Sequence, residues 1–568
     1  MGINPNCSKY EYLLKKNEGH MDVTALSFNN VRISYEELHE RIEDYAKVLY
    51  KRGIRQGDRI GVCVLNTPES VFLLYALDIL GAEVVGLSPF DKPHKLQYDI
   101  EITRPKMIIS VDTFYGAFKK AEKVLNFSTI LYSPIESIDD VKMKLGYKLM
   151  QIKNGNFKLS PNANLSSLVK KGGIIYEKAP HIERTCTDIL FTGGTTGTHK
   201  GVELAGESLN YVVKGMSEVF KAEPGMVHLG NIPIGHMAFG RLVMHLALCN
   251  NMEFALTLKA MPEDMYDEAV RTGAHAIVGG PPHWTSLIEK RGEEFVPSSR
   301  LKSGSLSNLK YASSGGEALK DATIPAINAA LNLCGSDAIL GDCLADSEFF
   351  AGGIVNNGRV NMPGTLGQPL STIKIKLINP DTNEIVKDGE PGLLYKSGPC
   401  MMLGYFNNPK ETANVITTDE NGEKWFNTGD FVRKNEVGEY EYVGRQKRNF
   451  VSTVENIYPE QLEEALIELP EIREIVVTPI SDPIKQFVPR YHISVYDEKL
   501  DINAFEERLR TFVEAQFGAN WLPGFIEYYY EPLQRMTNSK VDIGYYRDKD
   551  KEDIKNGTLT GEKTHIYK

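Results

Sequence analysis

Apolar and polar positions along the first 340 residues alternate in a way that predicts helices and strands in turn. Ser34 and Glu37 form a helix-starting capping box, after which apolar residues recur every three or four positions until Gly53. Unbroken apolar runs at 59–65 and 106–111 predict buried strands. Helices that alternate with buried strands favour an α/β fold in which helices cover a parallel sheet.

The pattern changes near Gly364. Segments of alternating polarity follow, separated by turns rich in Gly, Pro, Asn and Asp, at 371–380, 384–398 and 439–445. They predict a small β-barrel-like subdomain. Beyond them helices and strands alternate again, so we expect a large N-terminal domain over residues 1–444 and a small α+β C-terminal domain over residues 445–568.

Composition and charge narrow the possible classes of protein. The 568 residues are 42% hydrophobic and 24% charged, as in a soluble globular protein, and the formal net charge of −11 argues against nucleic acid as the main partner. The most apolar stretch, 71–90, contains Asp78 and Glu83, which we expect on the outer face of a packed helix. No membrane span is therefore predicted.

Cysteine usage and the N-terminal residues bear on the compartment. The seven cysteines are an odd number, widely scattered, without the paired spacing of a zinc site or a disulfide framework. The first residues lack an apolar stretch behind a basic start, which a signal peptide would have. We expect reduced thiols and a cytoplasmic location.

A loop rich in glycine and threonine is the sharpest local motif. An apolar strand leads into Thr192, Gly193, Gly194, Thr195, Thr196 and Gly197, followed by Lys200. Glycines let backbone amides approach phosphate oxygens, threonine hydroxyls add donors, and the lysine adds positive charge. Gly201 follows the lysine where a Walker loop has Ser or Thr, so this is a different phosphate loop. The alternative is a flexible glycine-rich turn.

Further motifs follow in order along the chain. They are NIPIGHMAFG at 231–240, YASSGGEAL at 311–319, CLADSEFF at 343–350, WFNTGD at 425–430 and PLQRMTNSKVD at 532–542. With the phosphate loop they resemble the adenylate-forming superfamily of acyl-CoA synthetases, aryl-CoA ligases, firefly luciferase and the adenylation domains of peptide synthetases. The resemblance spans nearly the whole chain. It implies an N-terminal domain of two helix-covered sheets followed by a mobile C-terminal domain.

The resemblance implies a place for the acyl group and for adenine. His236 would lie beside the acyl pocket, and the turn of Gly315, Gly316 and Glu317 would lie against the base. Leu344 stands where an aromatic ring usually stacks on adenine, so we expect only apolar contact there. The alternatives are a packed core histidine and a simple helix-starting turn.

The resemblance also assigns the metal and the catalytic cations. Glu348, next to the hydroxyl of Ser347, would hold magnesium against the ATP phosphates, as a hard carboxylate should. Lys200 and Lys540 would offset the charge that builds up on the α-phosphate, with Lys540 also near the substrate carboxylate. A lone acid or lysine would otherwise be a solvated surface group.

The resemblance assigns three further residues to the ribose site and the hinge. Asp430 would accept hydrogen bonds from the ribose hydroxyls, and Arg445 would reach ribose or phosphate. Lys447 would be the hinge about which the C-terminal domain turns. The alternative for this basic cluster is a solvated surface run. Val454 replaces the glycine that usually lines the passage for the pantetheine thiol.

These implications predict an ATP-dependent acid–thiol ligase. A hydrophobic carboxylic acid would become an acyl-adenylate and then a CoA thioester, with ATP, magnesium and CoA as the small molecules. One alternative hands the acyl group to the pantetheine arm of a carrier protein or to another acceptor. A third reading is a non-catalytic nucleotide-binding protein, since His199, Leu344 and Val454 depart from the family pattern. Either a monomer or a homodimer is compatible with the sequence.

Overall fold

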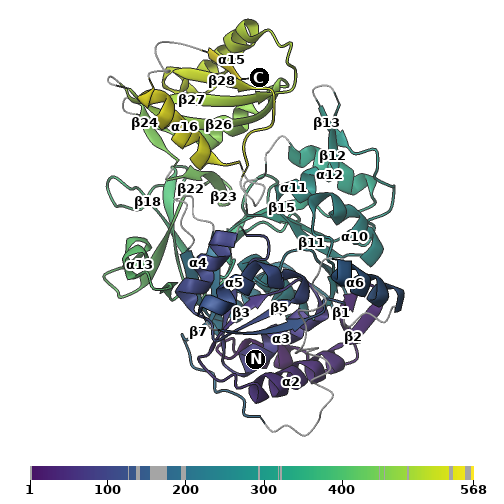
Figure 1. The fold of residues 1–568 in the computed structure, drawn as a ribbon. Helices are drawn as coiled ribbons and strands as arrows, with labels where there is room; N and C mark the ends of the chain where they lie inside the picture. The colour runs from purple at the N-terminus through teal and green to yellow at the C-terminus, as the bar shows by residue number, and fades with distance from the viewer. Residues whose placement is uncertain are drawn as a thin grey trace.

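The computed structural model of the chain contains four sheets of five or more strands and their helices (Figure 1). It describes residues 3–91, 93–125, 127–135, 141–153, 176–192, 200–291, 294–316, 319, 323–446, 448–452, 455–482, 485–535, 541–556 and 564–567. The α/β fold with two large helix-covered sheets, an antiparallel unit and a C-terminal α+β unit is as expected.

The first sheet has seven strands, and five of them are parallel. In sheet order they are β20 (Gly404–Tyr405), β8 (Lys200–Ala205), β7 (Cys186–Thr192), β4 (Glu83–Gly86), β3 (Arg59–Cys63), β5 (Met107–Val111) and β6 (Ser128–Tyr132). Strands β3 and β5 confirm the runs predicted at 59–65 and 106–111. The helices among these strands are α3 (Pro68–Ile79), α4 (Pro93–Thr103) and α5 (Tyr115–Leu125).

The second sheet has nine strands. In sheet order they are β17 (Gln368–Pro369), β16 (Gly353–Val355), β15 (Leu340–Ala345), β14 (Tyr311–Gly315), β11 (Ala276–Gly279), β9 (Val227–Gly230), β10 (Glu253–Leu256), β1 (Thr24–Phe28) and β2 (Val31–Ser34). The helices among its strands are α9 (Ala238–Cys249), α10 (Met265–Thr272), α11 (Pro281–Thr285) and α12 (Ile324–Leu333). Helix α8 (Gly206–Val219) packs on α9 and on strands β7 and β8 of the first sheet. Strand β1 pairs in parallel with β10, so the N-terminal segment completes a sheet formed mainly by the middle of the chain.

The largest apolar cluster draws on both sheets and on the helices packed with them. All twelve residues of α3 are buried, and α2 (Tyr35–Lys51) and α1 (Lys9–Lys16) pack against this helix. The expectation that Asp78 and Glu83 lie on the outer face of a helix is wrong. Asp78 is 7% exposed and lies 3.5 Å from Lys9, while Glu83 begins β4 and pairs with Arg59 at 2.9 Å. Burial is tolerated because each acid meets a cation.

An antiparallel five-stranded sheet follows, as the turn-rich segments predict. Its strands are β18 (Lys374–Ile378), β19 (Gly392–Ser397), β21 (Ile416–Thr418), β22 (Lys424–Lys434) and β23 (Tyr440–Arg445), with helix α13 (Pro409–Val415) between β20 and β21. Strand β20 leaves this region to pair with β8 of the seven-stranded sheet. The antiparallel unit is therefore attached to the strand that carries Lys200.

The C-terminal residues form a separate sheet with its own apolar cluster, drawn in yellow-green in Figure 1. Its strands are β24 (Phe450–Ser452), β25 (Glu455–Ile457), β26 (Ile472–Asp482), β27 (Gln486–Val495), β28 (Phe525–Tyr529) and β29 (Thr564–Tyr567), and its helices are α14 (Pro459–Leu466), α15 (Ile502–Phe517) and α16 (Ile543–Lys555). A hairpin of β12 (Ile288–Arg291) and β13 (Glu294–Pro297) reaches it, where Lys290 Nζ donates to the Pro470 carbonyl at 2.9 Å.

Two expectations about the chain as a whole can be checked directly. All seven cysteines are free thiols, as their scatter predicts. Among the described residues, no helix has both the length and the apolar composition that crossing a bilayer requires.

Candidate functional site

Two strands hold the ends of the predicted phosphate loop. Strand β7 ends at Thr192 and β8 begins at Lys200, and these two residues are antiparallel partners. The loop residues Gly193, Gly194, Thr195, Thr196, Gly197 and His199 lie outside the described residues. The pairing of β7 with β8 therefore brings Lys200 opposite Thr192, the residue at which the predicted loop begins.

Lys200 is connected to Glu348 through a tyrosine that the sequence motifs did not single out. Lys200 Nζ lies 2.5 Å from Glu411 Oε2 and 4.8 Å from the ring centre of Tyr405. The Tyr405 hydroxyl donates to Glu348 Oε1 at 2.8 Å. Tyr405 reaches this position because it pairs with Val202 across β20 and β8. The phosphate-loop lysine and the candidate metal carboxylate therefore share one cluster, although 148 positions separate them in the sequence numbering (348 − 200).

Glu348 stands beside a second acid and a buried lysine. It follows Ser347 in a single helical turn after β15, and burial, then Asp346, raises the pKa of Glu348. Lys396 Nζ, on a side chain that is 1% exposed, lies 2.5 Å from Asp346 Oδ2 and donates to the Gly352 carbonyl at 3.0 Å. The charge of Lys396 thus compensates that of Asp346, one of the two neighbouring acids. A role for Lys396 was not predicted, because no local sequence motif contains it.

The acids at this turn suit a divalent cation that is shared with a phosphate. Asp346 Oδ1 is buried and has no hydrogen-bond partner in the described part of the chain. No group of three or more His, Cys, Asp or Glu side chains surrounds a common position among those residues. Magnesium is typically held by one or two carboxylates together with substrate phosphates and water. Glu348 and Asp346 fit such a cation, and the protein alone does not form a complete cage for it.

Asp430 and Arg445 face each other across β22 and β23. Arg445 Nε donates to Asp430 Oδ1 at 2.7 Å, and Asp430 is 2% exposed. Burial raises the pKa of Asp430, and Arg445 acts against that shift. Asp430 first, and more weakly Glu348, raise the pKa of Arg445. The Asp430–Arg445 pair and the Glu348 cluster therefore lie within electrostatic reach of each other.

His236 occupies the turn between β9 and α9, where the two large sheets approach. A Cβ on Gly86, at the end of β4, would lie 2.9 Å from the Cα of His236. Burial lowers the pKa of His236 to about 4, so the ring is neutral at neutral pH, and its Nδ1 is buried without a hydrogen-bond partner among the described residues. The turn requires a glycine at position 240, because a Cβ on Gly240 would lie 2.0 Å from the Pro233 carbonyl oxygen. A neutral ring in this turn suits an apolar ligand.

The predicted adenine turn lies at the end of β14. Gly315 pairs with Cys343 on β15, and a Cβ on Gly315 would lie 2.5 Å from Cys343 Sγ. Gly316 has φ +87°, and no atom of the described residues beyond its chain neighbours lies within 4 Å of where its Cβ would be, as a close ligand approach requires. Leu344 packs against the apolar cluster of Ile354, Leu366, Leu377, Leu394 and Val432. Glu317 lies outside the described residues, as do Lys447, Val454 and Lys540.

Four buried charges behind the site were also missed. This buried quartet consists of Lys9, Asp78, Asp188 and Arg241, and each side chain is at most 7% exposed. Arg241 Nη1 lies 3.1 Å from Asp188 Oδ1, and Lys9 pairs with Asp188. Burial acts to raise the pKa of Asp188, but Lys9 and then Arg241 act to lower it. The net result is a lowered pKa.

The buried quartet is directly connected to two segments of the site. Asp188 precedes Thr192 on β7 by four residues, and Arg241 Nη2 donates to the carbonyl of Gly235, next to His236, at 3.0 Å. The quartet therefore connects the strand of the phosphate loop to the turn of the predicted acyl pocket.

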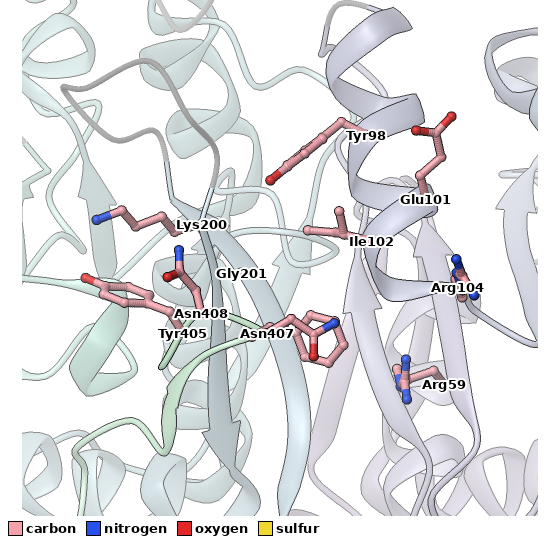
Figure 2. Close-up of a pocket in the computed structure, with 11 residues that line it drawn as sticks. Arg59, Tyr98, Glu101, Ile102, Arg104, Lys200, Gly201, Tyr405, Asn407 and Asn408 are labelled. Carbon is pink, nitrogen blue, oxygen red and sulfur yellow. The ribbon is translucent and has the colours of Figure 1, made fainter. Parts of the chain in front are cut away.

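A pocket of about 500 Å³ opens beside Lys200 (Figure 2). Side chains of α4 form one wall, the start of β8 and the end of β20 with the residues after it form the facing wall, and two arginines lie at one end. The lining residues are Arg59, Tyr98, Glu101, Ile102, Arg104, Lys200, Gly201, Tyr405, Phe406, Asn407 and Asn408. Among the predicted site residues that the structure describes, Lys200 alone lines this pocket. Tyr405, which was not predicted, also lines it, whereas Glu348 does not.

Comparison with known proteins gives consistent matches over most of the chain. A family model described as AMP-binding enzyme matches residues 13–406. A long-chain-fatty-acid–CoA ligase of Bacillus subtilis (strain 168) is 25% identical over 516 residues, which cover 89% of this chain and 88% of that protein.

Two solved structures illustrate the shared fold. ATP-bound MatB from Rhodopseudomonas palustris has a TM-score of 0.80 at 20% identity, with 97% of this chain and 99% of that chain covered. The amide bond synthetase McbA from Marinactinospora thermotolerans has a TM-score of 0.75 at 19% identity, with 95% and 99% covered. At these identities the two structures show the fold alone.

Proposed function

Because this chain belongs to the AMP-binding enzyme family, we propose that it activates a hydrophobic carboxylic acid with ATP and transfers the acyl group to CoA. The observation that carries the proposal is the cluster in which Tyr405 joins Lys200 to Glu348, within electrostatic reach of Asp430 and Arg445. A cation, a buried acid, a partly buried acid and an arginine in one region suit a nucleoside triphosphate better than a simple apolar ligand.

The first half-reaction needs positioning and charge neutralisation. A carboxylate oxygen of the acid bonds to the α-phosphorus of ATP, while the bond to the bridging oxygen breaks and pyrophosphate leaves with its electron pair. Magnesium bound at Glu348 and Asp346 would neutralise phosphate charge. Lys200 and Lys540 would offset the charge on the α-phosphate, as preorganised cations do in phosphoryl-type transfers. For this role Lys200 must exchange its contact with Glu411 for phosphate oxygens.

The ribose and the acid would occupy separate parts of the site. Asp430 would accept hydrogen bonds from the ribose hydroxyls, and the charge of Arg445 favours the ionised form of Asp430. Arg445 would also reach ribose or phosphate. Gly315, Gly316 and Glu317 would lie against adenine, with Leu344, Ser347 and the loop Thr192, Gly193, Gly194, Thr195, Thr196 and Gly197 completing the nucleotide site. The neutral ring of His236 would contact the acyl chain.

The second half-reaction moves the acyl group to a thiol. The CoA sulfur bonds to the acyl carbon as the bond from that carbon to AMP breaks, and the thiol proton is lost. We propose that residues 445–568 move as a domain about Lys447 between the two steps, which would withdraw Lys540 and admit CoA. The separate apolar cluster of the C-terminal sheet supports a unit that can move as a body.

The identity of the acyl acceptor is the part of the proposal for which there is an alternative hypothesis. Val454 stands where a glycine usually lines the thiol passage. A larger side chain there would narrow the passage for the pantetheine of CoA and of a carrier-protein arm alike, so a different nucleophile is the acceptor that it favours. McbA, which shares the fold, is an amide bond synthetase. The chemistry would proceed in the cytoplasm, where the seven free thiols stay reduced.

One assay separates these outcomes. Pyrophosphate release is measured with ATP, magnesium and a panel of aliphatic and aromatic acids, with and without CoA. Acid-dependent release that Glu348→Gln and Lys540→Ala each reduce at least about 100-fold, while Glu384→Gln at an exposed acid leaves it unchanged, would support adenylation. A thioester product would identify CoA as the acceptor. Release without a thioester would favour the other acceptors, and no release with any acid would refute catalysis.

A further inference from the structure

Helix α6 (Val141–Lys153) presents a row of apolar side chains to solvent. Val141, Leu145 and Leu149 are 79%, 57% and 59% exposed. They are four residues apart, and each step of four turns about 40° around a helix with 3.6 residues per turn. The three side chains therefore form one stripe along α6. Large exposed apolar groups gathered in one place are a sign of an interaction surface.

Lysines border this stripe on both sides. On the same helical geometry, Lys144 and Lys148 lie along one edge, within about 60° of the stripe, and Lys142 and Lys153 lie along the other, within about 40°. All four are exposed, and α6 contains no Asp or Glu. The chain as a whole has a net charge of −11, so this cationic helix departs from the charge of the rest.

The side of α6 opposite the stripe packs against the rest of the protein, so the stripe faces solvent. Tyr147 lies about 160° from the middle of the stripe. Its hydroxyl donates to Asp112, which directly follows β5, and its ring packs against the largest apolar cluster. In Figure 1 the helix lies at the outer edge of the N-terminal part, away from the C-terminal sheet.

We propose that α6 docks the protein on an anionic lipid bilayer. The apolar stripe would enter the boundary between headgroups and acyl chains, and the lysines would extend to the lipid phosphates on either side. Charge complementarity selects this occupant, because exposed lysines that border exposed apolar side chains match the phosphates of anionic lipids. The benefit to the enzyme, access to a hydrophobic acid that partitions into membranes, rests on the proposed function.

Vesicle binding tests the docking surface without any catalysis. The full chain is mixed with phosphatidylcholine vesicles that contain phosphatidylglycerol, in the absence of ATP and acid, and co-sedimentation is measured. We expect binding that weakens with salt. The double variant Leu145→Ser and Leu149→Ser should not bind these vesicles. The double variant Lys144→Gln and Lys148→Gln should bind about 30-fold more weakly, since each lysine near an anionic surface contributes about fivefold.

Matched variants elsewhere on the surface serve as controls. Val360→Ser with Val437→Ser removes apolar side chains that are 78% and 63% exposed, and Lys387→Gln with Lys424→Gln removes two exposed lysines. Both should bind vesicles like the unchanged protein, and circular dichroism should show all variants folded. Absence of binding to anionic vesicles, equal binding to pure phosphatidylcholine, or equal loss in the controls would overturn the proposal.

Two further readouts separate this inference from its competitors. If the leucine variant instead changes the sedimenting mass of the protein without vesicles, a second copy covers the stripe and the lipid proposal is wrong. Pyrophosphate release with a short, water-soluble acid should be the same for the leucine variant and the unchanged protein. Failure of that reaction in both proteins would refute the proposed function and leave the vesicle result standing.

Discussion

Removing one charge from the buried quartet is expected to destabilise the protein far more than the loss of a surface ion pair. The quartet carries two positive and two negative charges, on side chains at most 7% exposed. Arg241→Met or Asp188→Asn leaves one charge uncompensated in the interior. Removing one partner of a buried pair costs about 3–5 kcal/mol, against about 0–1 kcal/mol for an exposed pair.

The double variant restores the balance and supplies the sharper test. With Arg241→Met and Asp188→Asn together, Lys9 and Asp78 remain as a pair, 3.5 Å apart. No net charge is then left in the interior. We therefore expect the double variant to lose at least about 2 kcal/mol less stability than the sum of the two single variants, a coupling within the range seen for residues in one network.

Urea unfolding of the four proteins in this cycle measures the coupling. A chain of this size need not unfold in one step, so the transition is followed by both fluorescence and near-ultraviolet circular dichroism and compared where the two probes agree. Arg433→Met, which removes a half-exposed partner of Glu441, is the surface control and should cost under about 1 kcal/mol. Additive losses in the cycle, or single losses no larger than that of the control, would refute the charge-balance reasoning.

Other predictions concern the Glu348 cluster and the buried histidines. Tyr405→Phe removes the hydrogen bond to Glu348, and a bond to a charged group is worth about 1.5–3 kcal/mol, so a magnesium titration of pyrophosphate release should show about 10- to 100-fold weaker activation. Lys396→Met leaves Asp346 uncompensated and further raises the pKa of Glu348, so the acid limb of the activity profile should move to higher pH; an unchanged limb would contradict this. Burial lowers the pKa values of His39, His228 and His236 to about 4, so the unfolded chain alone gains protons as pH falls below about 6.5. Stability should then fall by about 1.4 kcal/mol per pH unit for each of them between pH 6.5 and 4, and a melting temperature that stays flat from pH 7 to 5 would argue against it.

Local patterns were sufficient for elements whose signal lies within a few residues. The Ser34 side chain caps α2 by accepting from the backbone N–H of Glu37 at 3.2 Å, as the capping box predicts. The apolar runs became β3 and β5 because an unbroken apolar strand is stable only where both faces of a sheet are covered. The order of the motifs indicated the family for the same reason, since each motif is a short piece of chain with its own chemistry.

The tertiary structure alone decided which distant residues meet. Tyr405 reaches Glu348 because β20 leaves the antiparallel unit to pair with β8, and strand pairing between remote segments has no local signal. Lys396 and Arg241 look like surface cations in the sequence, yet they are buried opposite acids from other elements. Hydrophobic periodicity reports which side of an element is covered, whereas charge compensation depends on what lies across the interface, and that is set only when the sheets and helices pack.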